Sequence, residues 1–161
     1  MQLDYGEFTF NHQHFYLAGT SKGLAFVGSP DADLAEISRF FPQATLEPNQ
    51  DTVQVAADAL VAYLSGQAMT VDVPLDVING TPLQRQVWTI LQEIPYGHTW
   101  NYTQLAQAVG RPTAVRAVAT AVGKNPLMLV IPCHRILRKD GALGGFRGGL
   151  PLKRQLLTLE A

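Results

Sequence analysis

Residues 101–125 read NYTQLAQAVGRPTAVRAVATAVGKN, and they decide the fold of the second half of this 161-residue chain. Asn101 is a residue type that caps helices, and it predicts a short helix that ends at Gly110. A second helix is expected to begin near Pro112. Two short helices joined by a tight, glycine-containing turn are typical of a helix-turn-helix, whose second helix enters a DNA groove.

The second of these helices has two different faces. Apolar residues at helical spacing predict a core face made of Val115, Val118, Ala119 and Val122. The other face is expected to carry small residues with a base near each end, namely Arg116, Ala117, Thr120, Ala121 and Lys124. Such a face lets a helix backbone approach phosphates closely. A core helix that packs through its alanines explains the same pattern equally well.

A longer helix precedes the pair, over residues 81–94 (TPLQRQVWTILQEI). Thr81 and Gln84 match a capping box, and Pro82 takes the first helical position. The apolar residues that share its inner face are expected to be Leu83, Val87, Ile90, Leu91 and Ile94.

The first half of the chain is organised differently. Partly alternating runs at 6–10, 14–20 and 23–29 predict antiparallel strands, and residues 31–41 and 51–66 predict helices. An extended connector over 71–80 ends in Asn-Gly. We therefore expect two domains, 1–78 and 79–161.

Composition limits the class of protein. The net charge of −1 hides a split, with a net charge of −8 over residues 1–80 and +7 over residues 81–161. This split suits a basic half that faces a polyanion, but also two halves that attract each other. One cysteine excludes an internal disulfide and a cysteine-rich zinc site. We see no signal peptide and no apolar run long enough to span a membrane.

The single cysteine follows the apolar run PLMLVIP (126–132), which predicts a buried strand. Downstream, Asp140-Gly141 predicts a hairpin turn, and GGFRGG (144–149) a mobile loop. The terminal helix is expected to turn Leu152, Leu156, Leu159 and Glu160 inward. A lone cysteine is most often an inert buried residue, whereas a cysteine beside basic groups can be a thiolate of low pKa.

An activated nucleophile needs a general base and a third group that orients this base. The residue types for these three roles are present in Cys133, His134 and Glu160. Neighbours in an extended chain point to opposite sides, so Cys133 and His134 need a turn or a bridging water to communicate. By itself this Cys-His pair is weak evidence, and a structural cysteine is the default.

Residues 81–160, from TPLQRQVW to LLTLE, closely resemble the O6-alkylguanine-DNA alkyltransferases. The matching blocks are IPYGHTWNYTQLA, RAVATAVGKNP, IPCHRIL and GALGGFRGGLPLKRQLLTLE, in the family's order. The resemblance implies an α/β (α+β) fold: a ribonuclease H-like N-terminal domain, then a mostly helical DNA-binding and catalytic domain with a helix-turn-helix.

The resemblance also implies roles for single residues. Cys133 matches the nucleophile that accepts the alkyl group, His134 a general base acting through water, and Glu160 the acid that orients and charges it. Asn125 matches a residue that shapes the active-site turn, and Tyr102 a proton donor to guanine O6. We expect the neighbours of Cys133 to keep its thiol ionised.

Arg116 matches the arginine that fills the gap left by a flipped nucleotide. The other expected DNA contacts are Ala117, Thr120, Thr103 and Lys124. Arg135 is expected to be structural, and Lys153 either structural or in contact with DNA. The expected substrate pocket comprises Ile136, Phe146, Arg147 and Gly148.

Three positions depart from the family pattern. Phe146 replaces a usual tyrosine, Arg147 a smaller residue, and Val122 a methionine found in some relatives. They bear on the range of alkyl groups, not on the type of reaction. The chain also lacks the cysteines of the structural zinc site found in some relatives.

The implied activity is direct, irreversible DNA repair, in which one alkyl group moves from O6-alkylguanine in double-stranded DNA to Cys133. We expect no metal, no cofactor, no membrane association, a monomer, and a cytoplasmic location, at the nucleoid if the protein is bacterial. Activity on O4-alkylthymine is left open. A non-catalytic lesion-binding relative carries tryptophan in place of the cysteine, so PCHR argues against it. A cysteine hydrolase leaves the helix-turn-helix and the basic half unexplained.

Overall fold

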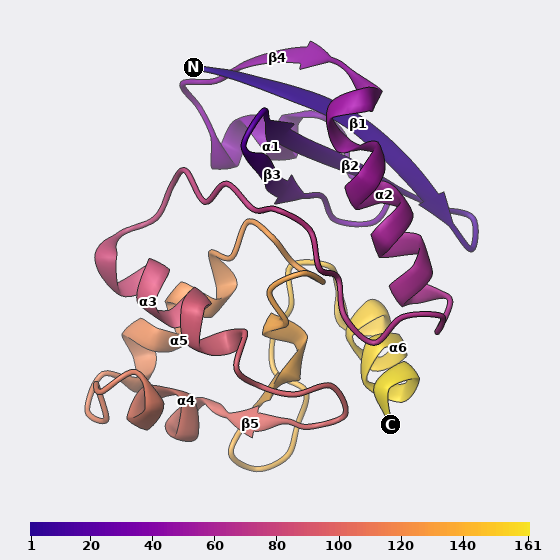
Figure 1. Ribbon diagram of the computed structural model, residues 1–161. Helices are drawn as coiled ribbons and strands as arrows, with labels where there is room; N and C mark the ends of the chain where they lie inside the picture. The colour runs from indigo at the N-terminus through magenta and orange to yellow at the C-terminus, as the bar shows by residue number, and fades with distance from the viewer. The chain divides into compact units, whose positions relative to one another are not determined.

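A computed structural model describes all 161 residues, and these form two compact units, Met1–Asn79 and Gly80–Ala161 (Figure 1). The division lies one residue from the boundary expected from sequence. None of the helices is both long and apolar enough to cross a membrane.

The N-terminal unit is built on a four-stranded sheet in the order β3-β2-β1-β4. Strands β1 (Gln2–Phe10), β2 (Gln13–Thr20) and β3 (Gly23–Val27) are antiparallel, as predicted. β4 (Thr45–Pro48) runs parallel to β1 and was not predicted, because its four residues include a proline and only one partly buried apolar side chain. This arrangement is that of a ribonuclease H-like sheet.

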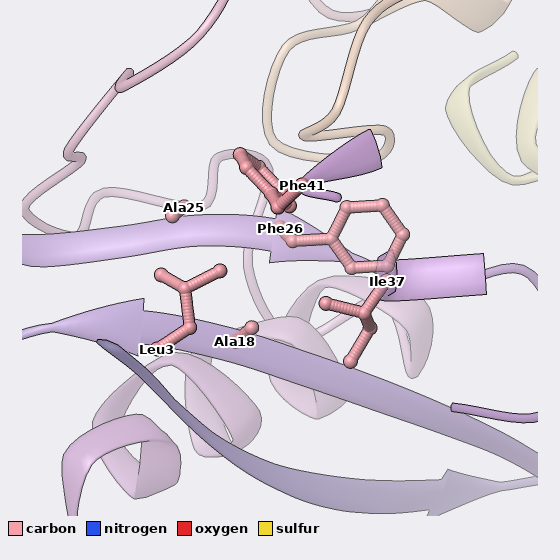
Figure 2. Packing of buried hydrophobic residues seen from close by; sticks show 6 residues of the cluster. All are labelled: Leu3, Ala18, Ala25, Phe26, Ile37 and Phe41. Carbon is pink, nitrogen blue, oxygen red and sulfur yellow. The ribbon is translucent and has the colours of Figure 1, made fainter. Parts of the chain in front are cut away.

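Two helices cover opposite faces of this sheet. On one face, Ile37 of α1 (Ala35–Phe40) and the adjoining Phe41 pack with Leu3, Ala18, Ala25 and Phe26, as Figure 2 shows. On the other face, α2 (Gln50–Leu64) lies against Gly6 of β1. A β-carbon at Gly6 would lie 2.6 Å from Val53 Cγ2, so glycine permits this close approach.

The C-terminal unit is mostly helical. It contains α3 (Pro82–Leu91), α4 (Tyr102–Ala108), α5 (Val115–Gly123) and α6 (Leu150–Glu160). α3, α4 and α5 pack on one another (Figure 1). Both predicted capping residues, Thr81 and Asn101, form complete capping boxes. The predicted helix-turn-helix is therefore present as α4 and α5.

Several local predictions were wrong at their edges. α3 ends at Leu91, so Ile94 is buried beyond the helix, and α5 starts at Val115 instead of Pro112. Ala121 is buried, not on the exposed face, because α3 packs against this side of α5, and Trp88 Nε1 of α3 donates a 2.8 Å hydrogen bond to the Ala121 carbonyl.

The largest correction concerns residues 126–132, which form a buried series of turns and not a strand. The Asn125 side chain supplies the local hydrogen bonds that a neighbouring strand would have supplied. The predicted Asp140-Gly141 turn is present, with Gly141 N–H donating to the Arg138 carbonyl, but no strands flank it as a hairpin.

Candidate active site

Asn125 organises the turn that leads into the cysteine. Its Nδ2 donates to the Ile131 carbonyl at 3.0 Å, and its Oδ1 accepts from the Leu127 N–H at 2.9 Å. Within this turn Leu129 has a φ of +74°, a left-handed conformation that L residues adopt only at a cost. The asparagine is itself buried, so the approach to Cys133 is held by a fixed side chain.

Cys133, His134 and Arg135 form one turn of 3₁₀ helix, and all three are buried. This turn resolves the problem that adjacent residues of an extended chain point apart. After it, β6 (Ile136–Leu137) pairs in parallel with β5 (Trp100–Asn101), directly before Tyr102. The short ladder therefore brings Tyr102 to the cysteine, although the two are 31 positions apart.

A buried network links this turn to the end of α6. Glu160 Oε2 accepts from His134 Nε2 at 2.8 Å. The Arg135 guanidinium donates to both oxygens of the same carboxylate, with Nε 2.8 Å from Oε1 and Nη2 2.9 Å from Oε2. Arg135 Nη1 also donates to the Ile94 carbonyl at 2.6 Å. Arg135 is thus a structural partner of the site, as predicted.

The contact with Glu160 decides which ring nitrogen of His134 is basic. With Nε2–H donating to the carboxylate, the lone pair of the neutral ring is on Nδ1. Burial lowers the pKa of His134, and the hydrogen bond and charge of Glu160 oppose this effect. The histidine is therefore neutral at rest and able to accept a proton.

The resting state of Cys133 differs from the expectation that its neighbours keep it ionised. Burial raises the pKa of the thiol above its ordinary value of 9.0. A hydrogen bond from the Asn125 side chain and the charges of Arg147 and Lys153 oppose this rise without reversing it. The prediction was wrong because sequence shows the basic neighbours but not the loss of water around the sulfur.

A cavity of about 200 Å³ opens at the cysteine. Its lining residues are Tyr102, Ala119, Val122, Gly123, Cys133, Gly145, Phe146 and Arg147. Of the expected pocket residues, Phe146 and Arg147 line it, whereas Ile136 and Gly148 lie outside this lining. The Phe146 ring also packs edge-on against His134, with ring centroids 6.4 Å apart.

A larger groove of about 840 Å³ shares Tyr102, Gly145 and Phe146 with this cavity. Arg138 and Arg154 contribute positive charge to its lining. The phenol of Tyr102 thus borders both spaces, and its pKa is raised mainly by burial.

Lys153 is fully buried in the first turns of α6, so of the two roles expected from sequence, structural or in contact with DNA, the structural one fits its position. Its ammonium donates to the carbonyls of Ile136, at 2.7 Å, Gly145, at 3.3 Å, and Leu143. Burial lowers its pKa to about 8. Its inward position follows from the helix period, because Lys153, Leu156 and Glu160 share one face of a 3.6-residue helix.

The expected DNA-contact residues do not join the buried network. On α5, the side chains of Arg116, Ala117 and Thr120 are exposed, as is Lys124 directly after the helix, and on α4 Thr103 is half-buried. Ala119 and Val122 of the same α5 helix line the cysteine cavity. One helix therefore connects an exposed surface of small and basic residues with the nucleophile.

No group of three or more histidine, cysteine, aspartate or glutamate side chains is arranged to hold a metal ion. Glu160 bonds to both His134 and Arg135, so its two oxygens already have partners, one of them a cation.

Comparison with known proteins gives this arrangement a family. Residues 82–161 match the model of the 6-O-methylguanine DNA methyltransferase, DNA binding domain. The inducible methylated-DNA–protein-cysteine methyltransferase of Bacillus subtilis is 41% identical over 155 residues, covering 94% of this chain and 86% of that protein. The chain belongs to the methylated-DNA–protein-cysteine methyltransferase family. The predicted resemblance is confirmed.

Solved structures support the same family and the predicted fold. Mycobacterium tuberculosis OGT, in a crystal structure in complex with DNA, superposes with a TM-score of 0.83 at 37% identity. The match covers 98% of this chain and 92% of that one. The α/β fold with its helical C-terminal unit is therefore the fold of this methyltransferase family.

Some relatives are longer. The bifunctional transcriptional activator/DNA repair enzyme Ada of Escherichia coli is 43% identical over 148 residues. That match covers 90% of this chain but 42% of the Ada protein. The methyltransferase chain described here corresponds to less than half of Ada.

Proposed function

We propose that this chain repairs double-stranded DNA by transferring the alkyl group of O6-alkylguanine to Cys133, once per molecule. The observation that carries the proposal is a cysteine at a cavity of about 200 Å³, next to a buried histidine that is bonded to Glu160. Membership of the methylated-DNA–protein-cysteine methyltransferase family supports the same chemistry.

Binding to DNA is assigned to α4 and α5. The exposed residues Arg116, Ala117 and Thr120 let α5 approach the sugar-phosphate backbone, and Lys124 adds charge at its end. The reacting atom lies inside a stacked duplex, so the nucleotide must be extruded at a cost of roughly a few kcal/mol. Arg116 fills the gap left in the stack, and the flipped base enters the cavity beside Tyr102.

The chemistry begins with the Cys133 proton, which passes to His134 through a bridging water. The sulfur electron pair forms a bond to the alkyl carbon, and the carbon–O6 bond breaks with its electrons moving onto guanine. Tyr102 donates its phenolic proton to O6 and recovers a proton from His134, so protons and charge balance. Glu160 stabilises the transient imidazolium.

The product is a thioether at Cys133, which has no easy route of hydrolysis. One molecule of protein therefore removes one alkyl group and is not regenerated. The cycle requires no metal or organic cofactor. We place it in the cytoplasm, at the nucleoid in a bacterial cell, with the protein acting as a monomer.

Two other functions are compatible with parts of the site. A lesion-binding protein that does not react would need no nucleophile, and Cys133 stands at the position where such relatives carry tryptophan. A cysteine hydrolase would use the same Cys133 and His134 but would turn over repeatedly. The first leaves Cys133 and the bonded pair His134 and Glu160 unexplained, and the second leaves the exposed basic face of α5 unexplained.

The decisive experiment is the intact mass of the protein after incubation with duplex DNA containing O6-methylguanine. We expect a gain of one methyl group per molecule and no gain in Cys133→Ser. Lesion-selective binding without a mass change would show a sensor and overturn the proposed transfer. Release of product beyond one equivalent would indicate a hydrolase.

A further inference from the structure

Arg147 is the one residue with a permanent charge in the lining of the cysteine cavity. The other polar or titratable members are Cys133 and Tyr102, and both have their pKa raised by burial. A guanidinium keeps its proton at every pH at which proteins are studied. It therefore faces the cavity as a cation whatever the state of its neighbours.

The guanidinium is held in position by the same asparagine that shapes the cysteine turn. Arg147 Nη2 donates to the Asn125 carbonyl at 3.2 Å, while the Asn125 side chain holds the turn before Cys133. The next residue, Gly148, has no room for a side chain, because a β-carbon there would lie 2.8 Å from Phe146 Cε2. The head group of Arg147 is thus held by a hydrogen bond, and the backbone directly after it is closely packed.

The other ionisable groups near Cys133 are either neutral or committed to other partners. His134 is neutral at rest because burial lowers its pKa. Lys153 of α6 is committed to three backbone carbonyls, and its pKa of about 8 lies close to the range in which a thiol ionises. Glu160 brings a negative charge next to His134, and the positive charge of Arg135 is paired with it.

We propose that Arg147 is a positioning residue that stabilises the Cys133 thiolate before alkyl transfer. Its guanidinium forms no covalent bond to the substrate and keeps its positive charge throughout the reaction. It lowers the cost of separating the thiol proton from sulfur in a cavity that otherwise disfavours the anion. The inference deepens the proposed function and rests on it only for the identity of the alkyl donor.

The test measures the thiol directly, without DNA. Alkylation of Cys133 by iodoacetamide is followed by intact mass between pH 6 and pH 10 in the unmodified protein, Arg147→Gln and Arg147→Lys. The charge of Arg147 lowers the pKa of Cys133, and one pKa unit is a tenfold change in the thiolate fraction, so at pH 7 we expect about tenfold slower alkylation in Arg147→Gln. Arg147→Lys should recover most of the rate.

Arg85→Gln removes the same charge from the exposed side of α3 and is the matched control, with an unchanged profile expected. An identical profile in Arg147→Gln, or equal losses in Arg147→Gln and Arg147→Lys, would overturn the inference. Thermal unfolding shows whether each substitution changes stability. A loss of stability in Arg147→Gln with no shift of its alkylation profile would also contradict the inference.

The result is separable from the proposed repair activity. If the iodoacetamide profile shifts as expected while the unmodified protein gains no methyl group from O6-methylguanine DNA, the proposed function fails and the role of Arg147 toward the thiolate stands. If methyl transfer occurs and the profile does not shift, the repair function stands and the inference about Arg147 fails.

Discussion

Glu160 is the residue on which the buried network depends, because one carboxylate serves two side chains. It accepts from His134 and pairs with Nε and Nη2 of the Arg135 guanidinium. Removing one partner of a buried ion pair is more costly than removing both, since the remaining charge is left in a medium of low dielectric. The free energy of folding should therefore respond strongly to this one side chain.

We expect Glu160→Gln to lower the free energy of unfolding by about 3 kcal/mol, because Arg135 keeps its charge and loses its anion. Urea denaturation measures the loss. The double variant Glu160→Gln with Arg135→Met is the control and should recover part of it, since no charge is then left unpaired. A loss below about 1 kcal/mol in the single variant is the value expected of an exposed pair, and would contradict the buried network.

His134 makes stability depend on pH. Its pKa in the folded protein is lowered by burial below the ordinary value of 6.5, so the unfolded chain binds more protons as the pH falls below that value. Stability from this group is fully present above pH 6.5 and is lost as the pH falls through the folded pKa. Urea denaturation between pH 7.5 and pH 5 should show the decline.

In His134→Asn the acid-side decline should become shallower, because the variant has no imidazole to protonate at this position. Other histidines remain in both proteins and act as an internal reference. An identical decline in the two proteins would mean that groups other than His134 cause it.

At the scale of elements, helix starts were predictable and the cysteine turn was not. The side chains of Thr81 and Asn101 cap their helices by accepting from the backbone N–H three residues later. The sequence signal for each helix start is therefore local. The seven residues 126–132 have the apolar character of a strand, but the Asn125 side chain closes them into turns. When a single side chain supplies the hydrogen bonds that a neighbouring strand would otherwise supply, the hydrophobic pattern of the sequence does not reveal it.

The cap of α4 offers a direct test of such local signals. Asn101 Oδ1 accepts from the Gln104 N–H at 2.8 Å, and the Gln104 side chain accepts from the Asn101 N–H. We expect Asn101→Ala to lower the free energy of unfolding by about 1 kcal/mol in urea. Asn101→Asp keeps the acceptor and should stay close to the unmodified protein. Equal losses in the two variants would show that the amide, not the cap, is what matters.

Across the whole molecule, the sequence shows that the acidic and basic residues lie in different halves. It does not show which distant side chains come together around Cys133. The residues that surround Cys133 come from α4, α5, the loop after β6 and α6, and only a resemblance to a family could relate positions so far apart. The bonds of Lys153 to backbone carbonyls and the bidentate contact of Arg135 with Glu160 also depend on the tertiary structure. The +7 net charge of residues 81–161, in contrast, follows from composition alone.

This charge distribution predicts how binding to DNA responds to salt. Each phosphate that a basic side chain neutralises releases counterions, and it contributes about −0.9 to the slope of log K against log salt concentration. If α5 is the DNA-contacting element, Arg116→Gln and Lys124→Gln should each make the slope less steep by about 0.9, measured by fluorescence anisotropy on an undamaged duplex. Lys22→Gln and Arg39→Gln remove the same charge from the acidic half and should leave the slope unchanged. A uniform change in all four variants would mean that net charge, not a defined surface on α5, attracts the duplex, and the assignment of the helix-turn-helix to DNA would be wrong.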